Sequence, residues 1–404
     1  MELVGVDRIK AAQQTLQGIV RLTPLRHSGV LEQRCATPVY LKCENLQRTG
    51  SFKIRGAYVR IHALPAERRA RGVVAASAGN HAQGVALAAA MLKIPATVFM
   101  PRPVALPKLE ATRGYGAHVH LVGEVVEEAL AAARAFARKT GAEFIHPFDH
   151  PDILAGQGTV GREVLEQLPG VGTVVVPTGG GGLLGGIAAA IKGVRPEVKV
   201  VGVQAQAAAV WPASLAAGAP VRLSPAATEH TMADGIAVSE LGPVSFAHVS
   251  ALADGVLTVG EEALSRALLL CLERAKLLVE PAGAAAVAAL LEAGAQFPGP
   301  ICAVLSGGNV DPLLLMHLIQ HGLSAAGRYL ALRVTMRDRP GELARLLARV
   351  GASGANVVDV AHSRIAGSLA VGEVVVGLNL ETRGSEHCSA LIAELAEAGY
   401  RVSS

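Results

Sequence analysis

The chain has 404 residues, 51% hydrophobic and 17% charged, which suits a globular protein of two or three domains. Its formal net charge is +4 with no run of basic residues, so the composition gives no support to nucleic-acid or membrane-surface binding. No apolar run reaches the roughly 18 residues of a membrane span without a charge or a turn. The amino terminus lacks a basic region followed by an apolar one, and we therefore expect no signal peptide.

The cysteines are odd in number and scattered among apolar strands and helices. They are Cys35, Cys43, Cys271, Cys302 and Cys388. Disulfide frameworks and zinc sites have characteristic spacings, which this chain does not show. The pattern predicts reduced, buried thiols, no metal site and a cytoplasmic protein.

Apolar strands alternate with helical patterns along most of the chain. Helices are predicted at 6–20 and 29–35, an extended X-Pro segment at 23–25, and strands at 39–43, 73–76, 96–100, 119–122, 143–146, 173–176, 198–203 and 301–305. Further helices are predicted at 54–64, 82–92, 107–115, 124–140, 153–168, 183–194, 261–276 and 283–293. This alternation predicts an α/β fold of parallel sheets covered by helices on both faces. The segment 212–250, rich in Pro, Gly and Ala, is predicted to be irregular, as in a lid or connector.

A domain boundary is predicted near 325–327. The pattern after it gives a strand at 328–336, a helix ending at 351, strands at 356–364 and 372–380, a helix at 385–398 and a strand at 400–402. The order βαββαβ is typical of a ferredoxin-like domain, and about 75 residues is a normal size for a small domain.

Lys53 is predicted to stand where a strand passes through the turn Thr49-Gly50-Ser51 into a helix. A lysine conflicts with the positive end of the helix dipole, and this conflict favours the neutral amine, which attacks carbonyl groups. A solvated surface lysine is the simpler interpretation, but three further motifs weigh against it.

Each of these motifs follows a predicted strand. They are Ser77-Ala78-Gly79-Asn80-His81, the glycine run Gly179-Gly180-Gly181-Gly182 with Leu183 after it, and Ser306-Gly307-Gly308-Asn309. Together with Ser51-Phe52-Lys53 they lie at the carboxyl ends of strands, where open α/β sheets bind ligands. Four such motifs in this order resemble the fold-type II pyridoxal phosphate enzymes. The resemblance covers nearly the whole chain and is closest to the threonine and serine dehydratases (ammonia-lyases).

The resemblance implies two doubly wound domains of the tryptophan synthase β kind, a large one at 1–42 and 147–326 and a small one at 43–146. It also implies that 327–404 is a regulatory ACT domain, a module that binds amino acids between paired copies. The segment Asp338-Arg339-Pro340-Gly341-Glu342-Leu343 would turn into its first helix. A dimerisation module without a ligand is the alternative. Pairing of sheet edges would make the protein a homodimer or homotetramer.

The implied cofactor is pyridoxal 5'-phosphate, which supplies the electron sink that side chains lack. Lys53 would hold it covalently and then act as the catalytic base, with Phe52 near the cofactor ring or simply in the core. Backbone N–H groups of the glycine run and of Leu183, at the start of a helix, would bind its phosphate. A flexible turn is the alternative interpretation of the glycines.

Two polar residues are carried over from the family as cofactor partners. Asn80 would pair with the ring hydroxyl, unless it only caps a helix, and Ser306 would pair with the pyridine nitrogen. A serine does not force that nitrogen to be protonated, which suits loss of a β-hydroxyl more than transamination. The substrate carboxylate would bind at the helix start formed by Ser77, Ala78, Gly79, Asn80 and His81. His81 is interpreted as a satisfied polar residue in preference to a general acid.

Three further positions refine the resemblance. Ala78 stands where serine racemases carry a second basic serine, so we expect little racemisation. Gln204 and Val210 stand where some relatives place acidic metal ligands, which disfavours a divalent ion and leaves a monovalent cation open. Glu280 resembles a family residue near the cofactor, and an acid that only satisfies the helix dipole is an equal alternative.

The function implied is deamination of L-threonine to 2-oxobutanoate and ammonia, and of L-serine to pyruvate, by α,β-elimination. This is the first step towards isoleucine, with regulation by isoleucine or valine through the ACT domain. A serine racemase or threonine synthase of the same fold is an alternative, and so is a catalytically dead amino-acid sensor.

Overall fold

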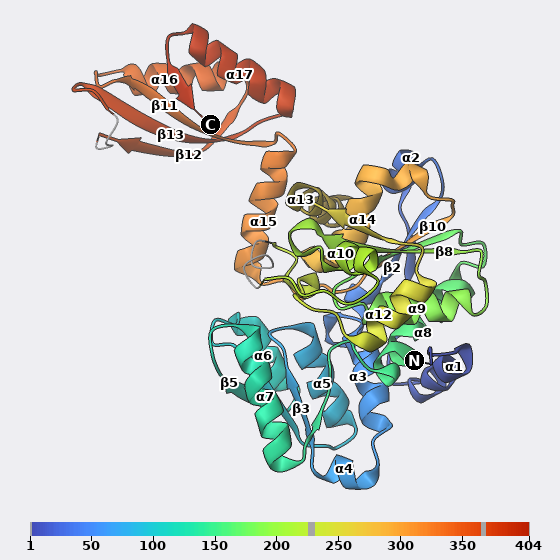
Figure 1. Cartoon of the computed structure of the whole chain (residues 1–404). Helices are drawn as coiled ribbons and strands as arrows, with labels where there is room; N and C mark the ends of the chain where they lie inside the picture. Colours follow the sequence, from blue (N-terminus) through green and yellow to red (C-terminus); the bar gives the residue numbers. More distant parts are fainter. Residues whose placement is uncertain (1, 225–230, 365–368, 404) are drawn as a thin grey trace. The chain divides into compact units, whose positions relative to one another are not determined.

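The computed structural model describes residues 2–224, 231–364 and 369–403. The chain divides into two compact units, Met1–Pro312 and Leu313–Ser404 (Figure 1). Within these described residues, the first unit carries two sheets whose strands are mostly parallel, and the second carries one antiparallel sheet.

The larger sheet of the first unit has the strand order β1-β2-β10-β7-β8-β9, parallel except for β1 with β2. Its strands are β1 (Leu25–His27), β2 (Val39–Cys43), β7 (Thr173–Pro177), β8 (Lys199–Ala205), β9 (Val256–Val259) and β10 (Ile301–Leu305). The side chains of β7 and β10 are buried throughout, as expected for a parallel sheet covered on both faces. The predicted α/β architecture is thereby confirmed.

The helices of the first unit, apart from α1, lie between successive strands along the chain. They are α1 (Val6–Thr15), α2 (Gly29–Cys35), α3 (Lys53–His62), α4 (Ala66–Ala70), α5 (Asn80–Met91), α6 (Leu106–Gly114), α7 (Val126–Thr140), α8 (Pro151–Gln167), α9 (Gly182–Lys192), α10 (Val210–Ala217), α12 (Pro243–Leu252), α13 (Glu261–Leu270) and α14 (Pro281–Ala293). Alternate residues of the larger sheet face opposite layers. Val175 packs in one core cluster with α14, whereas Val174 packs in another with α9.

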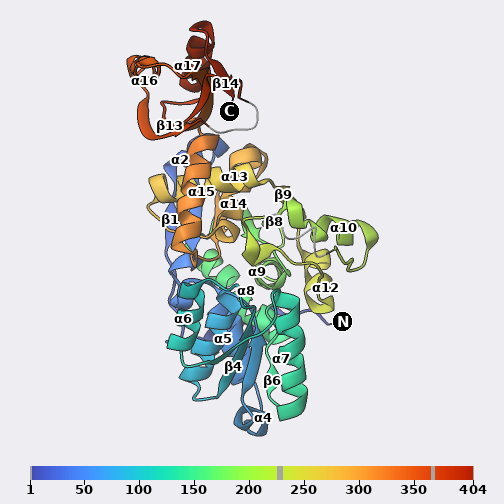
Figure 2. The ribbon, with the colours of Figure 1, turned by 90° about the vertical axis from the view of Figure 1, so that its left-hand side faces the viewer.

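The smaller sheet is wholly parallel, in the order β5-β4-β3-β6. Its strands are β3 (Val73–Ala76), β4 (Ala96–Met100), β5 (His118–Leu121) and β6 (Glu143–Phe144). Val73 of β3 shares a core cluster with residues of α5, and Val74 shares another with residues of α7. Figure 2 shows these two helices on either side of the sheet. Helix α3, which begins at Lys53, packs against both α5 and α8.

The segment 212–250 was predicted to be irregular, and this prediction is wrong in part. Helix α10 covers its beginning and α12 its end, and β9 follows as a strand that was not predicted. Neither helix alternates apolar and polar residues with a helical period, so composition alone suggested a loop. Pro243 occupies the first turn of α12, where proline is well tolerated. Residues 225–230 of this segment lie outside the described part of the chain.

The second unit begins one residue into α15 (Pro312–Ala325), a helix that was not predicted, and continues as a ferredoxin-like βαββαβ arrangement. Its elements are β11 (Tyr329–Arg337), α16 (Glu342–Ala352), β12 (Asn356–Ser363), β13 (Glu373–Glu381), α17 (Ser385–Glu397) and β14 (Arg401–Ser403). The sheet order is β12-β13-β11-β14. Alternate residues of β11, such as Leu332 and Val334, form a core with α16 and α17.

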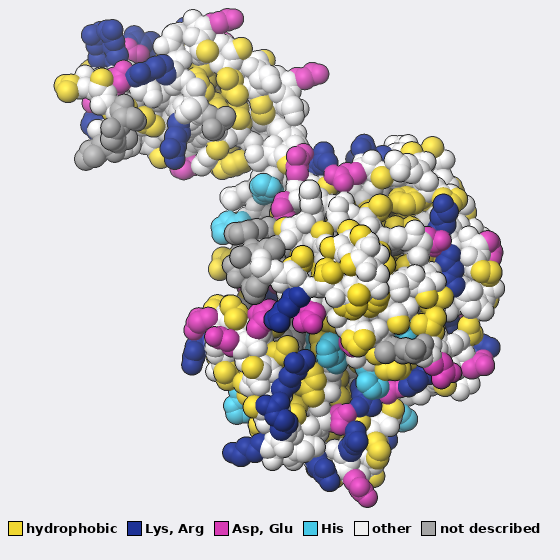
Figure 3. Space-filling model, viewed as in Figure 1, with side chains coloured by type: hydrophobic (Ala, Val, Ile, Leu, Met, Phe, Trp, Pro, Cys, Tyr) yellow, Lys and Arg dark blue, Asp and Glu magenta, His cyan; other side chains and the backbone are white. Residues whose placement is uncertain are grey.

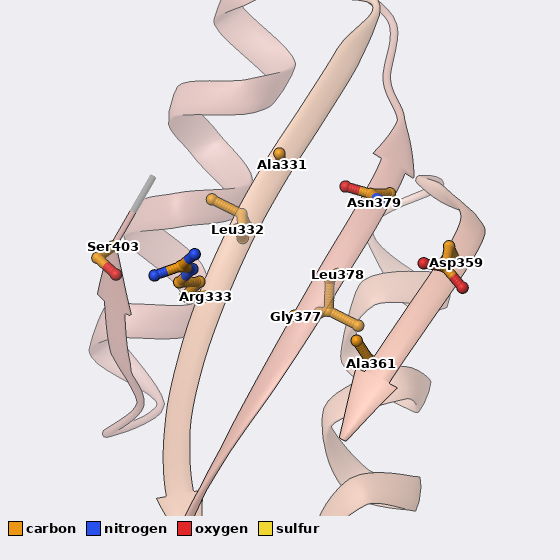
Figure 4. Close-up of a pocket in the computed structure, with 9 residues that line it drawn as sticks. All are labelled: Ala331, Leu332, Arg333, Asp359, Ala361, Gly377, Leu378, Asn379 and Ser403. Atoms are coloured by element: carbon orange, nitrogen blue, oxygen red, sulfur yellow. The ribbon is translucent and has the colours of Figure 1, made fainter. Parts of the chain in front are cut away.

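The opposite face of this sheet carries a shallow hollow of about 480 Å³ (Figure 4). Small and polar side chains line it, among them Arg333, Asp359, Gly377 and Asn379. Alternation along the strands explains this surface. The buried apolar side chains of β11 and β13 point to the helices on the other face, so the intervening residues line the hollow.

All cysteines are free, and four of the five are buried, as predicted. Basic, acidic and apolar side chains are interspersed on the face of the first unit seen in Figure 3. Among the described residues, no helix combines the length and the apolar composition that crossing a membrane requires.

Candidate active site

Lys53 is the first residue of α3, at the helix start where the sequence placed it. The turn before it reaches positive φ at Thr49 (62°) and Gly50 (69°). This turn lies against the end of β10, because the Phe52 N–H donates to the Ser306 carbonyl at 3.2 Å and Ser51 pairs with Gly307. The approach to Lys53 and the motif after β10 are therefore one local structure.

The amine of Lys53 is held inside the first unit. Its Nζ donates to the Pro147 carbonyl at 2.9 Å and lies 5.2 Å from the centre of the Phe52 ring. Burial lowers the pKa of Lys53 to about 8, although the negative charge of Glu280 acts in the opposite direction. The neutral amine is therefore accessible near physiological pH, as a nucleophile or base requires.

The glycine run leads directly into α9, of which Gly182 is the first residue. Gly181 has φ of +89°, a conformation that glycine adopts without strain. A side chain at Gly180 would overlap the Phe148 ring, and one at Gly182 would come within 2.8 Å of the Phe148 carbonyl. Pro147 accepts the hydrogen bond from Lys53, and the next residue, Phe148, packs against the glycine run. The dipeptide Pro147-Phe148 therefore lies between the Lys53 amine and the glycine run. Leu183 itself is buried in the core, so only its backbone is available to a ligand.

Asn80, the first residue of α5, is hydrogen-bonded to residues beside α14 and after β10. Its Nδ2 donates to Oε1 of Glu280 at 2.6 Å, and its Oδ1 accepts from Asn309 at 2.7 Å. Burial, assisted by the nearby charge of Asp234, raises the pKa of Glu280 to about 7. Glu280 thus has a direct partner among the predicted site residues, beyond its position at the start of α14.

Ser306 follows β10 and is almost fully buried. The next residue ties it to the Asn80 cluster, since the Gly307 carbonyl accepts from the Glu280 N–H at 3.1 Å. A side chain at Gly307 would overlap Glu280 and lie 2.9 Å from Nδ2 of Asn80. The structure therefore brings Phe52, Asn80 and Ser306 around the same space as Lys53.

The predicted substrate loop follows β3. Its Ser77 Oγ accepts from the Gly79 N–H at 3.1 Å, and Ala78 lies between them. His81 is buried, and its Nε2 donates to the Ile145 carbonyl at 2.8 Å. Burial and the charge of Lys53 lower the pKa of His81 to about 3. A neutral imidazole whose Nε2 is bound to the backbone supports the interpretation of His81 as a polar residue with a structural partner, which stays a prediction.

Lys108, which was not predicted as a site residue, lies close to this loop. Its Nζ is 3.9 Å from the position of a side chain at Gly79 and forms an ion pair of 3.1 Å with Asp234. The only local signal was a lysine in the first turn of α6, the same conflict with the helix dipole that identified Lys53. Phe148 and Trp211, which pack against the glycine run, were also missed, because nothing in their local sequence marks them.

The fold and this site define the class of the protein. The family model "Pyridoxal-phosphate dependent enzyme" matches residues 16–307, and the chain belongs to this family. It is 46% identical over 400 residues to an L-threonine ammonia-lyase of Thermotoga maritima, covering 99% of each chain.

Two solved structures are also similar to this chain in sequence and in fold. The threonine deaminase of T.th. is 42% identical, with a TM-score of 0.72, over 76% of this chain and 99% of that one. Maize serine racemase is 35% identical, with a TM-score of 0.74, over 80% of this chain and 99% of its own.

The residues present fit the family's cofactor, pyridoxal 5'-phosphate. A lysine of lowered pKa suits its aldehyde, and the glycine run at the start of α9 suits its phosphate, because helix N-termini bind anions. The buried Ser51 Oγ, beside Phe52, has no hydrogen-bond partner within the described chain. In the same described residues, no group of three or more His, Cys, Asp or Glu side chains is placed to hold a metal.

Proposed function

We propose that this chain is a threonine ammonia-lyase, which converts L-threonine to 2-oxobutanoate and ammonia, and L-serine to pyruvate. One observation carries the proposal: the amine of Lys53 is partly buried against the Pro147 carbonyl, has a pKa lowered to about 8, and is joined to the glycine run through Pro147 and Phe148. The L-threonine ammonia-lyase of Thermotoga maritima supports the choice of substrate, since it matches nearly the full length of this chain. In metabolism the reaction would be the first step towards isoleucine.

When bound, pyridoxal phosphate supplies the electron sink that lets a bond at the substrate's Cα break. Lys53 would hold the cofactor and, once released by the substrate amine, take the proton from Cα. The N–H groups at the start of α9 would bind the phosphate, while Asn80 and Ser306 would fix the ring from two sides. Glu280 is buried beside Asn80, and the bond between them is stronger there than it would be in water.

The substrate carboxylate would bind at the N-terminus of α5, at the loop that ends in Asn80 and His81. The Gly79 N–H is already used by Ser77, so the backbone donors would come from its neighbours. Lys108 would add a positive charge next to Gly79. Ala78 has no proton-transfer group, which supports elimination over racemisation.

The test is 2-oxoacid and ammonia production from L-threonine and L-serine by the holoenzyme, beside Lys53→Ala. We expect turnover of both substrates by the natural chain, and in Lys53→Ala neither turnover nor the visible absorbance of the lysine-bound cofactor. A chain that releases no ammonia would instead be a dead sensor. Formation of D-serine, or of threonine from phosphohomoserine, would identify a racemase or a threonine synthase.

We further propose that residues 327–404 are an ACT domain that tunes activity through isoleucine or valine, and that residues 1–326 hold the catalytic region. The ferredoxin-like strand order and the uncovered face that carries Asp359 and Asn379 support this assignment. A homodimer or homotetramer would result if such sheets pair. Deleting 327–404 should leave catalysis intact but abolish any response to isoleucine or valine; an unchanged response would refute the regulatory role.

A further inference from the structure

Trp211 is the single tryptophan of the chain, and it is built against the glycine run. It is the second residue of α10 and is fully buried. Its indole Nε1 donates to the Gly179 carbonyl at 2.6 Å, and its backbone N–H donates to Oε1 of Gln204, near the end of β8, at 3.0 Å. The tryptophan therefore links the end of one strand of the larger sheet to the turn that follows its neighbour.

The bond to Gly179 also fixes the direction of the N–H group of the next residue, Gly180. The Gly179 carbonyl and the Gly180 N–H belong to one planar trans peptide unit, in which these two bonds point in opposite directions. Fixing the carbonyl on Trp211 therefore aims the N–H away from Trp211. In the described part of the chain, the Gly180 N–H has no hydrogen-bond acceptor. It is a fixed donor at the edge of the candidate site, next to the N-terminus of α9.

Packing holds the same peptide in place. A side chain at Gly181 would overlap the Trp211 ring, and one at Gly180 would overlap the Phe148 ring. Trp211 is in turn stacked on Phe246, with ring centroids 6.2 Å apart and planes inclined by 12°. The glycine run therefore has little room to rotate a peptide plane. Preorganised donors of this kind bind an anion without an ordering cost.

We propose that Trp211 is a positioning residue for the cofactor phosphate, acting through the Gly179 carbonyl to aim the Gly180 N–H. This inference rests on the proposed role of the glycine run as the phosphate site. It assigns to Trp211 a polar function, carried by one N–H group, in addition to its packing.

The experiment compares the apoenzymes of the natural chain, Trp211→Phe and Phe246→Leu. Each is titrated with pyridoxal phosphate and with pyridoxal, which lacks the phosphate. We expect Trp211→Phe to weaken pyridoxal phosphate roughly 3- to 10-fold relative to pyridoxal, the effect of one net hydrogen bond. Phe246→Leu disturbs the packing of the same indole but keeps its N–H, so the ratio of the two affinities should not change.

The outcomes separate the two proposals. If the natural chain binds both ligands equally, the glycine run is not the phosphate site. The proposed role of the glycine run and the positioning role of Trp211 then both fail. If the natural chain prefers pyridoxal phosphate and Trp211→Phe weakens both ligands equally, or not at all, the positioning role alone is overturned. The natural apoenzyme offers a readout that needs no variant, because its tryptophan emission should change when inorganic phosphate binds. Unchanged emission while phosphate competes with the cofactor would contradict the inference.

Discussion

Asn80 donates its Nδ2 to Oε1 of Glu280 at 2.6 Å, which joins two residues that are 200 positions apart in the sequence. Through this bond the start of α5, in the smaller-sheet layer, is attached to the start of α14, beside the larger sheet. Glu280 also acts on Lys53, since its negative charge raises the pKa that burial lowers to about 8. Two groups of this one site, Glu280 and Lys53, therefore titrate close to neutral pH.

The first prediction concerns how cofactor uptake depends on pH. Only the neutral amine of Lys53 attacks the aldehyde, so the rate of reconstitution of the apoenzyme should rise about tenfold per pH unit below 8 and level off above it. Glu280→Gln removes the charge that stabilises the ammonium form, which lowers the pKa of Lys53 further. The midpoint of the rate profile should therefore move to lower pH. Stopped-flow absorbance measures this profile, and a midpoint that stays in place or rises would contradict the electrostatic link.

The second prediction concerns Lys108, whose Nζ lies beside Gly79 and pairs with Asp234. If Lys108 receives the substrate carboxylate, Lys108→Met should raise KM for L-threonine roughly tenfold with a much smaller change in kcat, because the lost contact is made by bound substrate and transition state alike. Lys108→Arg should recover part of the affinity. Asp234→Asn is the matched control, since it breaks the ion pair but keeps the lysine. Steady-state kinetics decide, and a KM raised equally by Asp234→Asn would assign the effect to the ion pair instead.

The strand ends could be read from the sequence because their signals are local. Glycine runs, apolar strands and a lysine at a helix start are visible within a few residues, and the strands predicted at 39–43, 73–76 and 301–305 are confirmed. The roles carried over for Asn80 and Ser306 stay predictions, although both lie around Lys53.

The features that escaped prediction depend on contacts between distant segments. The contact of Phe148 with Gly180, and the bond from Trp211 to Gly179, join residues more than thirty positions apart, and no local pattern announces them. The helices α10 and α12 were not predicted for a different reason. Their faces are almost uniformly apolar, so they lack the periodicity that marks an amphipathic helix.

The third prediction concerns a buried ion network two residues beyond Lys53. The fully buried Arg55 donates to both oxygens of Glu44 and both oxygens of Glu163, and Lys42 reaches Glu163 at 2.6 Å. Removing Arg55 leaves two buried carboxylates with one cation, so Arg55→Met should lower the free energy of unfolding by about 3–5 kcal/mol. The control is Arg266→Met, which breaks an exposed pair with Glu262 and should cost under about 1 kcal/mol. Denaturant unfolding of the apoenzyme measures both; equal losses would show that the network adds no more stability than one exposed ion pair.

The fourth prediction uses the contact between Gly180 and Phe148 to test the shape of the phosphate site. A methyl group at Gly180 would overlap the Phe148 ring, so Gly180→Ala should push the peptide out of line and weaken pyridoxal phosphate about tenfold or more. Phe148→Leu shortens the obstructing side chain, and the double variant should recover part of the loss, with a coupling of roughly 0.5–3 kcal/mol. Gly170→Ala is the control, because a side chain there meets nothing within 4 Å. Cofactor titration of the natural chain, the two single variants and the double variant measures the cycle. Strict additivity of Gly180→Ala and Phe148→Leu would mean that the two residues do not shape the site together.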